Sequence, residues 1–138
     1  MKSIFYILLL SCIFLNSCNT PSCAGVVFKN GVSLKDGKPY SGTCETYHPN
    51  RELKSIQTYS EGLDDGEWVF YFPNGKIQTK GQFNKGVRIG KWKYYAKNGK
   101  IWKVNTYNEV GEPFGEWETY DTINGNLSKV RNAKEIFN

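Results

Sequence analysis

The chain contains a single histidine, His48, and few leucines beyond residue 17. A nucleophile–base pair or a metal centre generally needs more than this, so His48, which precedes Pro49 in an expected turn, is interpreted as a surface residue. The scarcity of leucine excludes a leucine-rich repeat. We therefore expect no enzyme, no catalytic or metal-binding residue, no cofactor and no small-molecule substrate.

The chain also lacks an apolar run long enough to span a membrane. The longest run is Ile4 to Leu15, interrupted only by Tyr6, Ser11 and Cys12. A helix over this stretch would be about 18 Å long, against about 30 Å for the hydrocarbon core of a bilayer. Residues 1–17 are therefore predicted to be a secretory signal peptide.

The end of this leader resembles the bacterial lipobox. Leu15, Asn16 and Ser17 precede Cys18, which this resemblance marks as the acylated residue and the new N-terminus. A lipid on Cys18 would hold the protein on a membrane without spanning it, with residues 18–25 as a tether. Asn19, rather than aspartate, favours the outer membrane of the bacterial cell envelope. The alternative is an ordinary signal peptide with a chance cysteine.

Two further cysteines, Cys23 and Cys44, remain in the exported chain. In an oxidising compartment they could form a disulfide. Alternatively, Cys44 is a small apolar residue that fills a repeat position.

Four stretches of the chain are alike and evenly spaced. They begin at glycines that are 24, 24 and 25 residues apart: Gly42, Gly66, Gly90 and Gly115. A fixed period in this range is typical of a repeat architecture. The function is therefore expected to lie on a repeated surface rather than in a catalytic pocket.

Each repeat is predicted to be a β-hairpin. In the second copy, alternation around Trp68 and Phe70 favours a strand. Asn74-Gly75 favours a hairpin turn, because both residues tolerate positive φ, and alternation after Ile77 favours the return strand. The glycine two residues before each tryptophan is expected to leave room for a neighbouring aromatic ring. Asn84 through Gly90 is expected to connect this repeat to the next.

The expected fold is all-β, an elongated single-layer antiparallel meander of stacked β-hairpin repeats. Residues 26–41 are expected to form an N-terminal capping hairpin, residues 42–127 four repeats, and residues 128–138 a C-terminal cap or tail. Two aromatic rows should face opposite sides of the sheet, one of them forming its spine. These rows are Trp68, Trp92 and Trp117, and Tyr71, Tyr95 and Tyr120.

The pattern Gly-Glu-Trp-x-x-Tyr-x-x-Asn-Gly-Lys resembles the MORN-repeat variant of bacterial proteins. The resemblance covers about Lys35 to Leu127 and departs from the pattern at Cys44 and Arg51 in the first copy. It implies stacked hairpins. Many proteins of this kind are labelled the antitoxin component of a toxin–antitoxin system, so the resemblance also implies a protein that binds and silences a toxin.

Charge is unevenly distributed along the chain, although the net charge is only +5. No acid interrupts the segment from Lys76 to Lys103, and no base interrupts the acidic segment from Val104 to Asp121. The basic segment could simply favour solubility. Alternatively, it forms a basic aromatic surface for an anionic partner. The candidate residues are Lys76, Lys80, Arg88, Lys91, Lys93, Lys97, Lys100, Trp102 and Lys103.

Three functions follow from these features. The first is a non-enzymatic, membrane-anchored lipoprotein whose repeats bind an unknown protein or an anionic surface such as lipid or glycan. The second is an antitoxin or immunity protein that neutralises a toxin in the envelope. The third, an envelope hydrolase, is disfavoured by the lack of acid–base residues. Nucleic acid fits the charge, but an exported chain would not meet it routinely.

Overall fold

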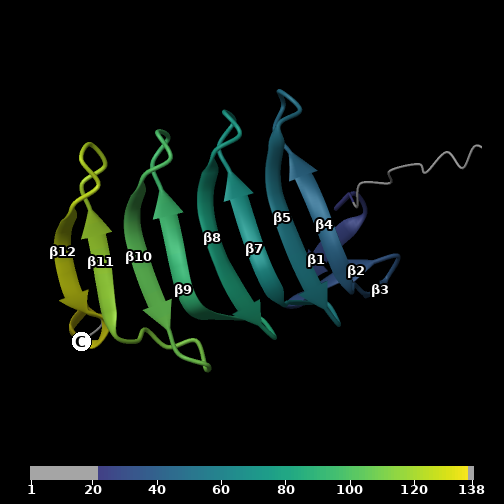
Figure 1. Cartoon of the computed structure of the whole chain (residues 1–138). Helices are drawn as coiled ribbons and strands as arrows, with labels where there is room; N and C mark the ends of the chain where they lie inside the picture. Colours follow the sequence, from purple (N-terminus) through teal and green to yellow (C-terminus); the bar gives the residue numbers. More distant parts are fainter. Residues whose placement is uncertain (1–21, 137–138) are drawn as a thin grey trace, which may run out of the picture.

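The computed structural model describes residues 22–136, which form twelve strands and one short helix (Figure 1). The elements are β1 (Val26–Lys29), β2 (Val32–Lys35), β3 (Lys38–Pro39), β4 (Gly42–Tyr47), β5 (Leu53–Ser60), β6 (Leu63–Asp64), β7 (Gly66–Tyr71), β8 (Ile77–Asn84), β9 (Val87–Tyr95), β10 (Ile101–Tyr107), β11 (Glu116–Tyr120), β12 (Leu127–Asn132) and α1 (Ala133–Ile136).

Nine of the strands form one open antiparallel sheet, which confirms the predicted all-β architecture of stacked hairpins. Its order is β12-β11-β10-β9-β8-β7-β5-β4, and β6 pairs with β5 beside this path. Four hairpins stand side by side in sequence order, with their turns at one end of the strands and their connections at the other end (Figure 1). We call the first set the tip turns and the second set the connecting turns.

The N-terminal segment is a separate small sheet rather than a single hairpin. Strands β1, β2 and β3 pair in that order. The backbone N–H of Ser33 donates to the carbonyl oxygen of Gly62 at 2.8 Å, and the N–H of Gly62 donates to Tyr40 at 2.8 Å. The expected hairpin is thus extended by a third strand, β3, which is two residues long. These bonds place the small sheet against the first connecting turn.

The boundaries of two other segments differ from the prediction. The fourth hairpin does not end at residue 127, because β12 starts there and pairs with β11 as far as Asn132. All six residues of β12 are exposed at the edge of the sheet, so burial imposes no apolar pattern by which the sequence would reveal this strand. Similarly, residues 87–89 extend β9 and pair with β8 instead of forming a connection.

The tip turns differ in backbone conformation from the expected type. In the three Asn-Gly turns the glycines Gly75, Gly99 and Gly125 have positive φ, at 76°, 92° and 82°, whereas the asparagines before them do not. In the first hairpin Arg51 takes this left-handed conformation, with φ 68°. By contrast, both residues of Lys85-Gly86 in a connecting turn have positive φ. The asparagines of the tip turns are therefore required for something other than backbone conformation.

Their side chains link neighbouring hairpins. Each of the first three asparagines donates from its amide nitrogen to a carbonyl oxygen in the next tip turn: Asn50 to Pro73 at 2.9 Å, Asn74 to Lys97 at 3.2 Å and Asn98 to Thr122 at 2.8 Å. Each amide oxygen accepts from the backbone N–H two residues later. We call this series the asparagine ladder.

The tryptophan row forms the spine of the sheet. Tyr59, Trp68, Phe83 and Trp92 make successive edge-to-face contacts, with ring centroids 4.9 to 5.4 Å apart. The indole N–H of each repeat tryptophan donates to a carbonyl oxygen in the return strand of the preceding hairpin: Trp68 to Thr58 at 2.8 Å, Trp92 to Gln82 at 3.2 Å and Trp117 to Thr106 at 3.0 Å.

The glycines before the tryptophans act differently from the expectation. Gly66, Gly90 and Gly115 have positive φ, and a side-chain carbon at Gly90 or Gly115 would meet nothing within 4 Å. These glycines are therefore needed for backbone conformation rather than for space. The close approach of an aromatic ring occurs instead at Gly81, where such a carbon would lie 2.2 Å from the Trp92 indole.

Cys23 and Cys44 are joined by a disulfide in the structure, with Cα atoms 4.9 Å apart. Cys44 is completely buried and takes the place of the repeat tryptophan in the first hairpin. The disulfide links the segment before β1 to β4, next to which Ser22 forms a parallel bridge with Glu45. The N-terminal edge of the large sheet is thus partly covered.

Candidate functional site

The two faces of the large sheet carry different side chains. Directly paired residues on neighbouring strands share a face. One row across the sheet is Glu45, Ile56, Val69, Lys80, Lys93, Val104, Glu118 and Val130. We call the face with this row the lysine face. The face with the repeat tryptophans is called the indole face.

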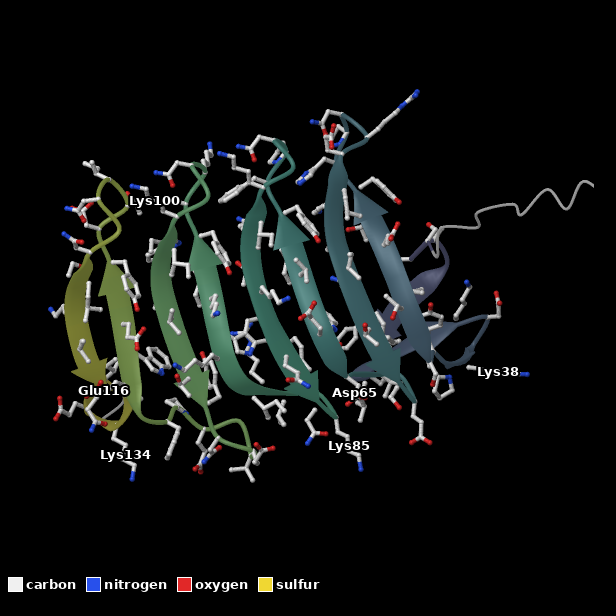
Figure 2. All side chains as sticks on the ribbon, in the orientation of Figure 1. Lys38, Asp65, Lys85, Lys100, Glu116 and Lys134 are labelled. Carbon is white, nitrogen blue, oxygen red and sulfur yellow. A yellow bond between two sulfur atoms is a disulfide. The ribbon has the colours of Figure 1, made fainter. Side chains whose placement is uncertain are left out.

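The structure does not bring the predicted basic residues together on one surface. On the lysine face lie Lys80, Lys91 and Lys93, and on the indole face lie Arg88, Trp102 and Lys103. The tip turns carry Lys76, Lys97 and Lys100. Figure 2 shows Lys100 at the end of the strands where the tip turns lie and Lys85 at the opposite end. The reason is that alternate residues of a strand point to opposite faces of the sheet, so residues that are close in the sequence do not necessarily share a surface.

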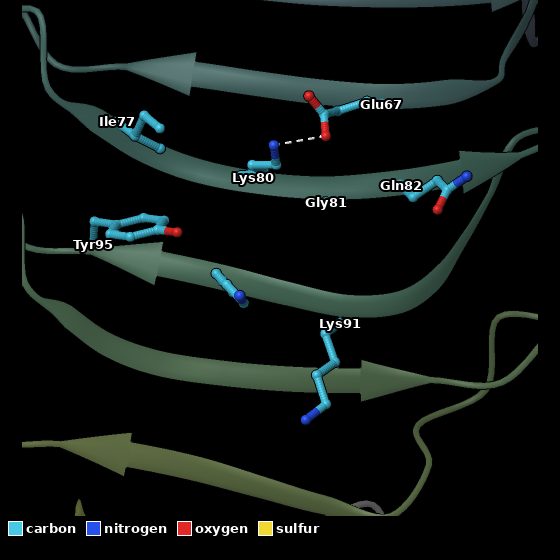
Figure 3. A pocket seen from close by; sticks show the side chains of 8 residues that line it. Glu67, Ile77, Lys80, Gly81, Gln82, Lys91 and Tyr95 are labelled. Atoms are coloured by element: carbon cyan, nitrogen blue, oxygen red, sulfur yellow. Dashed lines mark ion pairs between the residues drawn. The ribbon is translucent and has the colours of Figure 1, made fainter.

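The lysine face is hollowed at its centre. A shallow pocket of about 590 Å³ is lined by residues of β7, β8 and β9, among them Glu67, Lys80, Lys91, Lys93 and Tyr95. Figure 3 shows these side chains around the strands and the ion pair between Lys80 and Glu67. The pocket contains three ammonium groups and one carboxylate.

The charges of this pocket are only partly compensated. Lys80 Nζ lies 2.7 Å from Glu67 Oε2, and this is the one salt bridge within residues 22–136. The hydrogen bond to Glu67 and its negative charge raise the pKa of Lys80. Lys93 lies directly opposite Lys80 across the strand pair. Glu67 compensates Lys80, whereas Lys91 and Lys93 have no salt bridge within residues 22–136, so an anionic group placed between these two lysines would be held favourably.

Comparison between hairpins shows that this charge is local. The residue after the repeat tryptophan position is Glu45, Val69, Lys93 and Glu118 in the four hairpins, and only the third is basic. In the outer two, a tyrosine hydroxyl two residues later donates to the glutamate, as in Tyr120 to Glu118 at 2.5 Å. This hydrogen bond raises the pKa of Tyr120. A glutamate that accepts a hydrogen bond from a tyrosine therefore lies on each side of the basic centre of the lysine face.

The predicted tyrosine row lies on the lysine face. Tyr71, Tyr95 and Tyr120 are half-buried there, three residues after their tryptophans. The prediction that the two aromatic rows face opposite sides thus agrees with the strand pairing, and the spine is the tryptophan row.

A second pocket, which we call the C-terminal pocket, lies on the indole face over the last two hairpins. It has a volume of about 340 Å³ and is lined by Trp102, Lys103, Trp117, Thr119, Lys129, Arg131 and Ile136. Lys129 and Arg131 were missed by sequence analysis because the strand that carries them was assigned to a tail. Their spacing of two residues was the available signal, since it places both on one face of a strand.

The remaining predicted residues lie apart from these pockets. His48 is half-buried, and its Nε2 is 2.9 Å from the carbonyl oxygen of Tyr71, which indicates a structural contact between tip turns. Cys18 lies outside the described residues. Within residues 22–136 no group of three or more histidine, cysteine or acidic side chains could hold a metal ion. In the same part of the chain, no helix has the length and apolarity that crossing a bilayer requires.

Comparison with known proteins supports the repeat assignment. Residues 64–85 and 88–109 match the MORN repeat variant, so the second and third hairpins are MORN-type repeats. The first match covers β7 and β8, and the second covers β10 and all but the first residue of β9. Among curated proteins no match was found.

Two solved structures show a limited likeness to the chain. The crystal structure of TarM matches 78% of this chain and 20% of its own, with a TM-score of 0.45 and 16% identity. A variant of S. aureus TarM in complex with fondaparinux, alpha-GlcNAc-glycerol and UDP matches 78% of this chain and 19% of its own, with a TM-score of 0.42 and 16% identity. The chain therefore spans about a fifth of the length of these structures.

Proposed function

We propose that this protein is a non-enzymatic interaction module, anchored by a lipid at Cys18 to the bacterial cell envelope, whose lysine face binds an acidic protein. MORN repeats suggest an interaction module for proteins or membranes, and this supports the binding role. An open sheet also leaves both of its faces available to a partner.

The centre of the lysine face is the observation on which the proposal rests. Lys91 and Lys93 stand where the second hairpin has Glu67 and Val69. Both lysines are exposed, and Lys93 faces Lys80 directly. Glu67 already pairs with Lys80, whereas Lys91 and Lys93 have no salt bridge within residues 22–136, and the repeat itself does not require either lysine. A carboxylate from a partner would compensate these two charges, and Tyr95 beside them offers an apolar contact.

The antitoxin or immunity role implied by the MORN resemblance is one case of this function, with a toxin as the acidic partner. In that case the lysine face would be the surface that meets the toxin. The proposal does not depend on the partner being a toxin.

Photo-crosslinking in cells that naturally produce the chain tests the lysine face. A photoreactive residue at Gln82, which is exposed and lines the lysine pocket, should give one discrete protein adduct. The same residue at Gln78, four positions earlier on β8, is the matched control and should not. The double variant Lys91→Glu/Lys93→Val reproduces the residues of the second hairpin, so it should fold and abolish the adduct.

Two results would contradict this function. One is an adduct at Gln82 that persists in the double variant. The other is the absence of a protein adduct combined with sedimentation on phosphatidylglycerol vesicles that the double variant loses, because the partner would then be the membrane.

The lipid anchor has an independent test. Metabolic labelling with an alkyne fatty acid should mark the chain, and Cys18→Ser should abolish the label and release the protein from membranes. Cys12→Ser, within the apolar part of the leader, should leave the label unchanged. Unlabelled protein in the culture medium would show that no anchor is present.

A further inference from the structure

We infer that the C-terminal pocket binds an anionic saccharide, with Trp102 as the stacking platform and Lys103, Lys129 and Arg131 as the groups that pair with its charges. The site lies on the opposite face of the sheet from the lysine pocket and is independent of the proposed function. It is formed by β10, β11 and β12 together with Ile136 of α1.

Trp102 occupies a position that is polar in every other hairpin. In each hairpin the return strand contains a β-bulge, and the unpaired residue is Lys54, Gln78, Trp102 or Ser128 in order along the chain. A bulge redirects a side chain away from the regular row, and Trp102 is 40% exposed as a result. The repeat fold therefore does not need an aromatic ring at this position, and an exposed indole is available for a ligand.

The cations of the pocket are also departures from the repeat. The residue after the bulge is Ser55, Thr79, Lys103 or Lys129, so it is basic only in the last two hairpins. Two residues further along the strands are Gln57, Gly81, Asn105 and Arg131, of which only the last is charged. Positive charge has thus been concentrated at one end of the indole face, next to Trp102.

These cations have no acidic partner among residues 22–136, where the only salt bridge is that of Lys80. Lys103 Nζ lies 5.4 Å from the ring centre of Trp117, 6.0 Å from that of Trp102 and 5.7 Å from that of Tyr94. These aromatic faces hold the ammonium group in place but do not neutralise it. Lys129 and Arg131 are exposed on the edge strand. The pocket therefore has uncompensated positive charge that an anion would neutralise.

The spacing of the charges favours a ligand with several anionic groups. Lys103 and Lys129 are both paired with Thr119, one from each side, so two strand spacings, about 10 Å, separate their backbones. Such a separation favours several linked anionic groups over a single phosphate or carboxylate. An oligosaccharide with carboxylate or sulfate groups can reach them while the apolar face of one sugar ring lies on the Trp102 indole. A volume of about 340 Å³ is at the lower end of the range for ligand pockets.

Calorimetric titration of the full chain in a mild detergent tests the site. The probes are hexagalacturonate and a heparin hexasaccharide, at least one of which should bind. The methyl ester of hexagalacturonate retains the rings without the charges, and inorganic polyphosphate has charges without rings. Both should bind at least roughly tenfold more weakly than the charged saccharide, because the ester cannot pair with the cations and polyphosphate cannot stack on Trp102.

The variants exchange pocket residues for those of the second and first hairpins, so that the fold should tolerate them. Trp102→Gln copies Gln78, Lys103→Thr copies Thr79, and Arg131→Gln copies Gln57. Each should weaken binding by roughly tenfold, as loss of a stacking or charge-assisted contact does. Lys93→Val removes the same charge from the lysine face and should leave saccharide binding unchanged.

Several outcomes would overturn the assignment. The first is that neither charged saccharide binds. The second is that polyphosphate or a nucleoside triphosphate binds as tightly as the charged saccharides. The third is that Trp102→Gln does not weaken saccharide binding. Weakening by Lys93→Val would place the ligand on the lysine face instead. Because the protein adduct from Gln82 depends on Lys91 and Lys93, failure of either proposal leaves the other intact.

Discussion

The indole ring of Trp92 lies against the backbone of Gly81 on the neighbouring strand, and the space between them cannot hold even a methyl group. A side-chain carbon at Gly81 would lie 2.2 Å from Cδ2 of Trp92, which is itself only 2% exposed. This contact explains how a single-layer sheet buries a large aromatic ring: the backbone of one hairpin provides the floor on which the ring of the next one packs.

Gly81→Ala should therefore destabilise the protein by about 2 kcal/mol or more, because Trp92 would have to leave its position. The free energy of unfolding from urea denaturation is the measurement. In a Trp92→Ala background the same change should cost much less, since the clash no longer exists. Equal costs in the two backgrounds would show that the contact is not responsible.

The asparagine ladder predicts different effects for two chemically identical substitutions. Asn98→Asp keeps the oxygen that accepts from the Lys100 N–H at 3.0 Å, but loses the amide that donates to Thr122 at 2.8 Å. We expect a loss of about 1 kcal/mol in urea denaturation.

The control is Asn124→Asp in the last tip turn. Its oxygen accepts from Asn126, whereas its amide nitrogen has no acceptor within the described range 22–136. This substitution should change stability little. If both substitutions cost the same, the bonds between turns contribute nothing and only the local turn matters.

The disulfide between Cys23 and Cys44 closes a loop with a sequence separation of 21 residues. Its removal by Cys23→Ala should lower the free energy of unfolding by about 3 kcal/mol, mainly through the greater freedom of the unfolded chain. Mass spectrometry of peptides without reductant should detect the linked pair in the native protein. Cys12→Ser should have no such effect, and alkylation of both thiols without reductant would contradict the pairing.

Asp64 predicts an effect of pH on stability. Burial raises the pKa of this carboxyl above its ordinary value of 3.8. The folded state therefore holds the proton more firmly than the unfolded state. The resulting stabilisation is present below pH 3.8 and is lost as the pH rises through the folded-state pKa.

Asp64→Asn should accordingly raise the neutral-pH free energy of unfolding, by less than about 1 kcal/mol because the group is half-exposed. The gain should shrink below pH 3.8, where the wild-type carboxyl is protonated in both states. Urea denaturation at several pH values measures it, and Asp65→Asn supplies the control with the same change of charge. A gain that is independent of pH would have another cause than burial.

The sequence by itself determined the repeat, its hairpin unit and the positions of the tip turns. The period of the glycines and the alternation around Trp68 and Trp92 are local properties of the chain, and local geometry follows from them. The return strand expected from Ile77 onward is β8, Ile77–Asn84. Positive φ at Arg51 also follows from its place in the turn.

Only the tertiary structure decided which residues share a surface. Lys91 and Lys93 face one side, whereas Lys103, although near in sequence, joins Lys129 and Arg131 on the other. Strand pairing and a bulge at Trp102 determine this division, and the order of charges along the chain reveals neither of them. The edge strand β12 was missed for a different reason: all six of its residues are exposed, so burial imposes no apolar pattern that the sequence could show.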